Sequence, residues 1–216
     1  MSIPDVTIGK QINYGNKYRF TLFNESIFQL IFFHDVRTEE KYFTPSNVRQ
    51  YFGRYMYSLL SNLEAESLYK TNDKYEFILQ YPELNGSNYN CWRQSLSPTI
   101  QTEDNIENET GRPQVLGYEN LSIHYTSSNW GGLSLSGSNQ TTYVNGNINT
   151  SYWHYAIGCY GYEKGIPGPF GNKNYLKLVA LYVKIASLDM IMCVSCKVYR
   201  NLFLNPHAFL FVFILM

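Results

Sequence analysis

The residue types that could carry out chemistry are sparse in this chain and are not spaced as a catalytic site. The four histidines, His34, His124, His154 and His207, lie far apart, and no HxxxH or HExxH spacing occurs. We therefore interpret His34 with Asp35, and His154, as structural residues rather than as parts of an acid–base pair. The chain also lacks a GxSxG nucleophile elbow and a GxxxxGK[ST] phosphate loop. No catalytic residue is predicted, and an enzyme is the least favoured class of function.

Metal and redox chemistry have little support in the sequence. Cys193 and Cys196 form a single CxxC, which is half of a zinc site or a redox pair, but no second CxxC or close pair of histidines accompanies it. Unpaired thiols in a terminal segment are the favoured interpretation. Cys91 and Cys159 leave the reduced and the disulfide-bonded states open. Because the acidic residues between 103 and 109 lack EF-hand spacing and are typical of a solvated loop, neither a metal site nor a cofactor is predicted.

The three tryptophans are the best candidates for ligand binding. A sugar needs an aromatic plane for its C–H face and fixed amides or hydroxyls for its OH groups, and the neighbours of each tryptophan supply such groups. The alternative is that all three pack within the core or turns of a sheet. The predicted ligand-binding residues are Trp92, Asn129, Trp130, Tyr152, Trp153 and His154.

Composition excludes some partners and favours a β-rich fold. Among 216 residues, 17 basic residues balance 17 acidic ones, so no positively charged footprint for nucleic acid is present. The 20 Tyr, 13 Phe and 3 Trp favour half-buried pleated surfaces. The apolar run 208–216 is about half the length that spans a bilayer, so no membrane span is predicted.

Two features bear on location and point in different directions. Residues 1–20 contain no apolar run of the kind found in a secretory signal, which indicates a cytosolic chain or an incomplete N-terminus. Six Asn-x-Ser/Thr sequons favour a secreted glycoprotein, with simple richness in Asn as the alternative. An extracellular location is the working hypothesis. The sequons begin at Asn24, Asn85, Asn108, Asn120, Asn139 and Asn149.

Apolar periodicity predicts one helix and several strands. Residues 48–70 carry aromatic and leucine side chains mostly three and four residues apart, which predicts a principal helix packed on a sheet. Strict alternation over 75–81 and 117–125 predicts strands, as do the apolar runs at 18–33 and 175–185. We expect one face of these strands to be buried, formed by Tyr75, Phe77, Leu79, Leu121, Ile123, Leu181 and Val183.

These elements together predict an α+β fold, mainly an antiparallel β-sheet of sandwich type with one principal helix. The expected organisation is an N-terminal segment over 1–17, a single β-rich recognition domain over 18–185 and an atypical apolar tail over 186–216. The GIPGP segment, 165–169, is predicted to form a rigid corner before the closing strand, because its prolines fix φ and remove N–H donors.

Nine segments in order resemble a module found in invertebrate and protist proteins, including secreted proteins of the cnidarian skeletal organic matrix. The resemblance covers about residues 28–184 and implies a non-enzymatic extracellular module with no catalytic residues to carry over. SLSP at 95–98 and Asn145-Gly146 depart from the module's usual SNP and Asp-Gly. The order of the last elements, an aromatic strand, a Gly/Pro corner and a final LYV strand, is also similar to that of fibrinogen-like lectins. The segments are FQLIFFHD, RYMYSLLSNLE, YEFILQYPEL, NYNCWRQS, GYENLSIHY, WGGL, SYWHYAIG, GIPGP and LYVK.

The function predicted from the sequence is recognition. A carbohydrate-binding or adhesion module, with a glycan or an extracellular protein as its partner, is the first hypothesis. A structural matrix or scaffold unit that binds protein is the second, and an enzyme is the third because acid, base and nucleophile constellations are missing.

Overall fold

The computed structural model describes residues 11–14, 18–38, 42–44, 46–84, 89–100, 114–125, 130–135, 144–146, 156–157, 165–167 and 175–186. The chain divides after Ile185 into two units, 1–185 and 186–216, and the features below belong to the first. The predicted tail lies outside the described residues apart from Ala186, and so does most of the predicted N-terminal segment.

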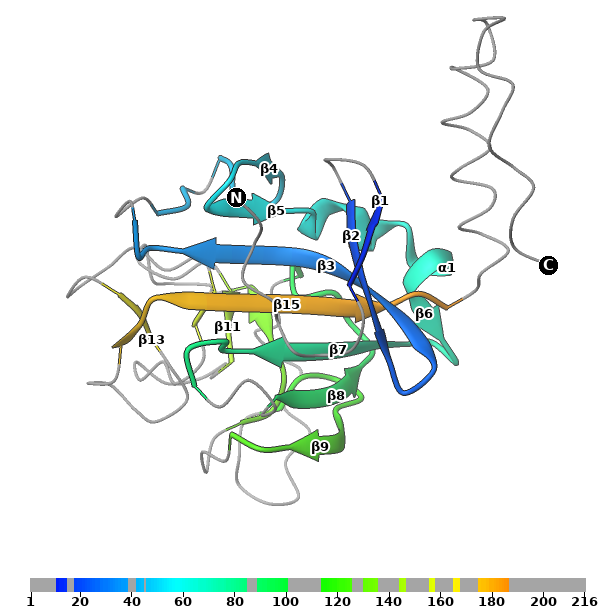
Figure 1. Cartoon of the computed structure of the whole chain (residues 1–216). Helices are drawn as coiled ribbons and strands as arrows, with labels where there is room; N and C mark the ends of the chain where they lie inside the picture. Colours follow the sequence, from blue (N-terminus) through cyan, green and yellow to red (C-terminus); the bar gives the residue numbers. More distant parts are fainter. Residues whose placement is uncertain are drawn as a thin grey trace, which may run out of the picture. The chain divides into compact units, whose positions relative to one another are not determined.

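A ten-stranded sheet forms the body of the first unit, and all its strand pairs are antiparallel (Figure 1). The last strand of the sheet, β15, lies between β3 and β7, because its seven-residue, largely apolar sequence suits a strand with neighbours on both edges. The path through the sheet is β1 (Gln11–Tyr14), β2 (Tyr18–Phe23), β3 (Ser26–Asp35), β15 (Leu178–Lys184), β7 (Lys74–Gln80), β8 (Asn90–Gln94) and β9 (Glu119–Ile123).

Shorter strands complete the architecture. β4 (Tyr51–Phe52) pairs with β5 (Met56–Ser58), β5 pairs with β3, and β6 (Lys70–Thr71) pairs with β7. A small three-stranded sheet contains β10 (Ser134–Leu135), β11 (Val144–Asn145) and β12 (Ala156–Ile157). A separate two-stranded sheet contains β13 (Ile166–Pro167) and β14 (Tyr175–Leu176). The antiparallel β-rich fold predicted from the sequence is confirmed, while a sandwich of two packed layers stays a prediction.

Tight two-residue turns join β2 to β3 and β6 to β7. Asn24 and Glu25 have φ values of 44° and 61°, and Asn72 and Asp73 have 52° and 60°. Left-handed conformation at both central residues matches the twist of the flanking strands, and Asn and Asp tolerate it better than most residues. Glu25 is the residue least suited to such a position.

Both faces of the main sheet are buried near its centre. Phe77 pairs with Trp92 on one face, named here the Trp92 face, and Ile78 pairs with Cys91 on the other, the Cys91 face. The β1–β2 pair crosses the strands β3, β15 and β7 in Figure 1. It covers the Cys91 face, since the Arg19 guanidinium lies 5.4 Å from the centroid of the Tyr57 ring. The buried cluster on this face comprises Phe28, Leu30, Phe33, Tyr57, Leu59, Ile78, Cys91, Leu178, Ala180 and Tyr182.

The predicted buried face is confirmed at the centre of the sheet and wrong at its edge. Tyr75, Phe77, Leu79, Leu181 and Val183 have no exposed surface. Leu121, in contrast, is 39% exposed, and Ile123 is only partly buried. Their strand, β9, is an edge strand, and its pairing with β8 shifts between Cys91 and Trp92 so that Leu121 faces no partner. A bulge of this kind disrupts the simple alternation from which the burial was predicted.

The predicted principal helix over 48–70 is wrong. The segment contains the strands β4 and β5, a 3₁₀ helix η1 (Leu60–Glu64) and an α-helix α1 of only four residues (Glu66–Tyr69). Gly53 connects the two strands and donates its N–H to Met56 O at 2.9 Å, and glycine is unfavourable inside a helix. The aromatic residues beside it favour strands, and pairing of β5 with β3 outweighs the local three- and four-residue spacing.

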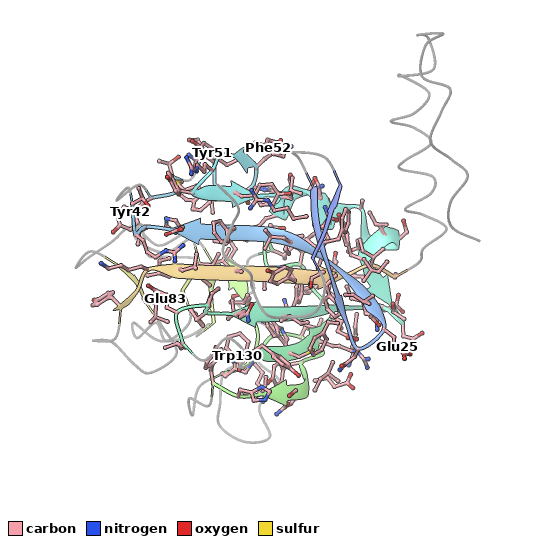
Figure 2. The ribbon with its side chains drawn as sticks, viewed as in Figure 1. Glu25, Tyr42, Tyr51, Phe52, Glu83 and Trp130 are labelled. Atoms are coloured by element: carbon pink, nitrogen blue, oxygen red, sulfur yellow. The ribbon has the colours of Figure 1, made fainter. Side chains whose placement is uncertain are left out.

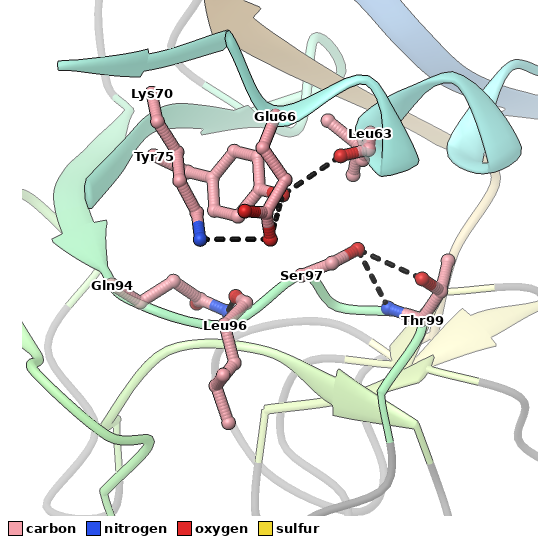
Figure 3. A network of polar contacts seen from close by, with 8 residues as sticks. All are labelled: Leu63, Glu66, Lys70, Tyr75, Gln94, Leu96, Ser97 and Thr99. Carbon is pink, nitrogen blue, oxygen red and sulfur yellow. Dashed lines mark hydrogen bonds and ion pairs between the residues drawn. The ribbon is translucent and has the colours of Figure 1, made fainter. Parts of the chain in front are cut away.

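The helical turns are fixed to the sheet by polar contacts (Figure 3). The Tyr75 hydroxyl donates to Leu63 O at 2.7 Å, and Lys70 Nζ bonds Glu66 Oε1 at 2.8 Å. Burial raises the pKa of Tyr75 above its ordinary value, with a smaller contribution from Glu66. The hydroxyl therefore remains a hydrogen-bond donor at physiological pH.

Candidate functional site

Two of the predicted ligand-binding tryptophans lie together in the interior. Trp92, on β8, has no exposed surface, and Trp130 is only 7% exposed. Their rings are perpendicular, at 89°, with centroids 4.8 Å apart, which is a favourable edge-to-face contact. Figure 2 labels Trp130, whose ring contacts the Trp92 side chain of β8. Neither ring offers the open face on which a sugar stacks.

Gln94 joins these two tryptophan segments through its side-chain amide. Its Oε1 accepts from Trp92 Nε1 at 2.8 Å and from the Leu133 N–H at 3.0 Å. Its Nε2 donates to Leu96 O at 2.7 Å and to Leu133 O at 2.8 Å. All four hydrogen-bonding positions of a primary amide are thus used in a residue that is completely buried.

Gly132 allows the second segment to approach closely enough for these bonds. Its φ is +96°, and a Cβ at this position would lie 2.3 Å from Val115 Cγ2 and 2.8 Å from Gln94 Oε1. Glycine is therefore required here for both conformation and space. The segments NYNCWRQS and WGGL thus form a structural junction, named here the Gln94 junction.

The predicted ligand-binding residues consequently have two outcomes. The positions of Trp92 and Trp130 favour the alternative interpretation, packing within the sheet. Asn129, Tyr152, Trp153 and His154 lie outside the described residues. The binding role of the set stays a prediction.

A pocket on the Cys91 face has the features of a binding site that the sequence did not reveal. Its volume is about 190 Å³. Residues of β6, β7, β8, β9 and β15 and of the β6–β7 turn line it, so its walls are part of the sheet. We name it the ionic pocket; its lining residues are Thr71, Asn72, Lys74, Glu76, Arg93, Glu119 and Lys184.

Opposite charges alternate across the four neighbouring strands of this pocket. Arg93 pairs in register with Glu76 on one side and with Glu119 on the other. Arg93 Nε and Nη2 each lie 2.9 Å from Glu76 Oε2, and Nη1 lies 3.3 Å from Glu119 Oε1. The hydrogen bond that Arg93 donates to Glu76 raises the pKa of Arg93 above its ordinary value. Arg93 is therefore the fixed centre of this row of alternating charges.

The two lysines are held more loosely than Arg93. Lys184 Nζ lies 3.6 Å from Glu76 Oε1, and Lys74 Nζ lies 3.5 Å from Glu119 Oε2. Both distances exceed a normal N–H···O hydrogen bond, so each ammonium keeps donor capacity toward the pocket. Lys74, Lys184 and Glu119 are all about a third exposed, at 32%, 28% and 42%. A ligand in the pocket can reach all three groups.

Sequence analysis missed this site because its residues become neighbours only through strand pairing. The alternation over 75–81 places Glu76 on the face opposite Phe77, and Arg93 lies within the WRQS segment. Those signals indicate two charged positions, but the order β15, β7, β8, β9 cannot be derived from periodicity. Only that order brings Lys184 beside Glu76.

The other titratable residues offer little chemistry in the described part of the chain. His34 is completely buried, and His124 Nδ1 lies 2.7 Å from Tyr89 O. Burial raises the pKa of the Cys91 thiol to about 12, so the thiol remains protonated. Within the described ranges, no group of three His, Cys, Asp or Glu side chains is arranged to hold a metal ion. None of the helices described there is long and apolar enough to cross a membrane.

Comparison with known proteins returns no match. No family model, no curated protein and no solved structure matches the chain. A function is therefore proposed from the geometry of the described residues and from the sequence features given above.

Proposed function

We propose that the protein is a non-enzymatic recognition module of extracellular type that binds carbohydrate at the ionic pocket. The observation that carries the proposal is the pocket's set of donors and acceptors, mounted on adjacent strands of one sheet. Sugar hydroxyls donate to carboxylates and accept from ammonium and guanidinium groups, and both kinds of partner line the pocket. The resemblance to modules of secreted proteins and the six sequons also support this function.

Rigid placement of these groups favours recognition of a small polar ligand. Glu76 and Arg93 are already fixed by their mutual hydrogen bonds, so binding does not have to order them. The pocket is small, and little apolar area is buried in it. We therefore expect affinities of about millimolar to micromolar for a single sugar.

The same geometry argues against glycoside hydrolysis in the pocket. Hydrolysis requires two carboxyl groups that flank the scissile bond. Arg93 occupies the strand between Glu76 and Glu119 and bonds both, so the bond to be cleaved has no place between them. Among the described residues, no Ser, Cys or His lines the pocket as a nucleophile or base.

Titration of a saccharide panel, followed by amide shifts in NMR spectra, tests the proposal. Binding at the pocket shifts the amides of Lys74, Glu76 and Arg93 and is lost in Arg93→Ala, whereas Arg54→Ala, on the β4–β5 turn, binds normally. If saccharides shift only Trp indole signals, the tryptophan site predicted from the sequence replaces the pocket. If no saccharide shifts any signal, carbohydrate binding is refuted.

A scaffold that binds protein is the second candidate, because β4 presents two exposed aromatic residues at an edge of the sheet (Figure 2). Tyr51 is 37% exposed and Phe52 is 46% exposed. Exposed edge strands with apolar side chains are sites of strand addition by another chain. Concentration-dependent self-association that is abolished by Phe52→Lys, with no effect of any sugar, would select this function.

We also propose that the small sheets pack on the Trp92 face as the second layer of a sandwich. The support is the Gln94 junction, which ties Leu133, next to β10, to β8. Inter-residue NMR contacts between β10–β12 and the Trp92 face would test this arrangement.

A further inference from the structure

We propose that the ionic pocket selects an acidic saccharide, one that carries a single carboxylate or sulfate group bound by the lysine ammonium groups that line the pocket, those of Lys74 and Lys184. This inference rests on the proposed carbohydrate-binding function and specifies its ligand class. The acid group would accept hydrogen bonds from the lysine ammonium groups, which make only long ion pairs with the described carboxylates. The ring hydroxyls would donate hydrogen bonds to the carboxylates of the pocket.

The charge balance of the pocket favours a ligand with one negative charge. Lys74, Arg93 and Lys184 contribute three positive charges, and Glu76 and Glu119 contribute two negative ones, which leaves a net charge of +1. A neutral sugar leaves this charge uncompensated as it displaces water, while a monoanion neutralises it. A cationic sugar would be repelled.

The contacts within the pocket show which groups are available to each part of the ligand. Arg93 uses Nε, Nη1 and Nη2 on the two carboxylates. With the described residues the two lysines make ion pairs of 3.5 Å and 3.6 Å, longer than a hydrogen bond, so their N–H donors can turn to an incoming oxyanion. Glu119 is 42% exposed and can accept hydroxyl protons on its outer side. Recognition of the acid group is therefore assigned to the lysines.

Pocket size limits the ligand to about one sugar unit. The volume of about 190 Å³ has room for one sugar ring with its acid group, but not for an oligosaccharide. Two lining residues, Thr71 on β6 and Asn72 in the β6–β7 turn, are exposed, so a chain of sugars would continue into solvent there. A terminal or protruding acidic unit of a glycan fits this description.

Calorimetric titration with glucuronate, glucose 6-sulfate, glucose, glucosamine and sodium sulfate tests the inference on the full chain. We expect both acidic sugars to bind at least about tenfold more tightly than glucose, and glucosamine to bind more weakly than glucose. Raising the salt from about 50 mM to 300 mM should weaken the acidic sugars and leave glucose nearly unchanged. The two acidic sugars distinguish a carboxylate from a sulfate as the preferred group.

Substitutions of the charged pocket residues should change the affinity for acidic sugars in opposite directions. Lys74→Gln and Lys184→Gln should each reduce affinity for the acidic sugars about tenfold, while Lys177→Gln, an exposed lysine outside the pocket, should have no effect. Glu119→Gln raises the net charge of the five groups to +2 and should strengthen acidic-sugar binding by about threefold. Thermal unfolding of each variant verifies that the fold is retained.

The outcomes separate this inference from the proposed function. If glucose binds as tightly as glucuronate, the pocket binds carbohydrate and the acidic selectivity is wrong. If sodium sulfate binds as tightly as glucose 6-sulfate, the sugar contributes nothing, and both proposals fail in favour of a simple anion site. If no saccharide binds, the carbohydrate function itself is wrong.

Discussion

Replacing Gln94 with methionine should remove a large part of the free energy of unfolding. The variant keeps the length of the side chain but leaves the Trp92 indole N–H, the Leu133 N–H and the carbonyls of Leu96 and Leu133 without their partner. A buried polar group that loses its partner costs about 1 to 3 kcal/mol. Methionine avoids the desolvation of the amide itself, which offsets part of the sum. We expect a net loss of about 3 to 6 kcal/mol.

Urea unfolding followed by far-UV circular dichroism measures this loss. With a slope of about 2 kcal/mol per molar urea, the midpoint should fall by roughly 1.5 to 3 M. Gln50→Met is the matched control, because Gln50 is exposed and surface substitutions change stability by less than about 0.5 kcal/mol. Hydrogen exchange of the Trp92 indole N–H should also accelerate. A loss below about 1 kcal/mol, with the indole proton still protected, would refute the role assigned to the Gln94 junction.

Three further substitutions and one labelling experiment test other parts of the structure. Phe77→Ala removes a completely buried ring that lies 5.7 Å from the Tyr75 ring and should cost about 3 to 5 kcal/mol in urea unfolding; a cost under about 1 would contradict its core position. Gly132→Ala should cost at least about 1 kcal/mol, because its φ is +96°, and an unchanged midpoint would contradict that conformation. Glu25→Gly should add about 0.5 to 1 kcal/mol by relieving a φ of 61°, and a destabilised variant would show that the turn differs. The Cys91 thiol, with a pKa raised to about 12, should resist iodoacetamide at pH 8 in the native protein and react after unfolding; rapid native labelling of its peptide would contradict its burial.

Strand burial was predictable where a strand is paired on both edges, because regular pairing there preserves the alternation of its side chains. Tyr75, Phe77 and Leu79 alternate in a central strand, and their burial follows from the sequence. Leu121 continues the same pattern in an edge strand, but a bulge changes its direction. Periodicity reports the ideal strand and carries no information about local irregularities in pairing.

The segment 48–70 shows where apolar spacing gives the wrong secondary structure. Its apolar residues occur at helical spacing, yet they belong to two strands and two short helical turns. Each of those pieces is shorter than the window over which periodicity is measured, so the pattern averages over different structures. Gly53 and the neighbouring aromatic residues are the local signals that favour strands, and pairing with β3 decides between the alternatives.

The Gln94 junction and the ionic pocket together explain why ordered motifs indicate the fold more directly than the ligand. Trp92, Gln94 and Gly132 occur in the WRQS and WGGL segments, and their contacts hold the chain together. Arg93 lies between Trp92 and Gln94 in sequence but points to the opposite face, into the ionic pocket. Strand β8 therefore carries residues of the Gln94 junction and a residue of the proposed binding pocket at alternate positions. Under the proposed function, substitutions of Glu76, Glu119 or Lys184 should therefore change ligand binding while the Gln94 junction is left intact.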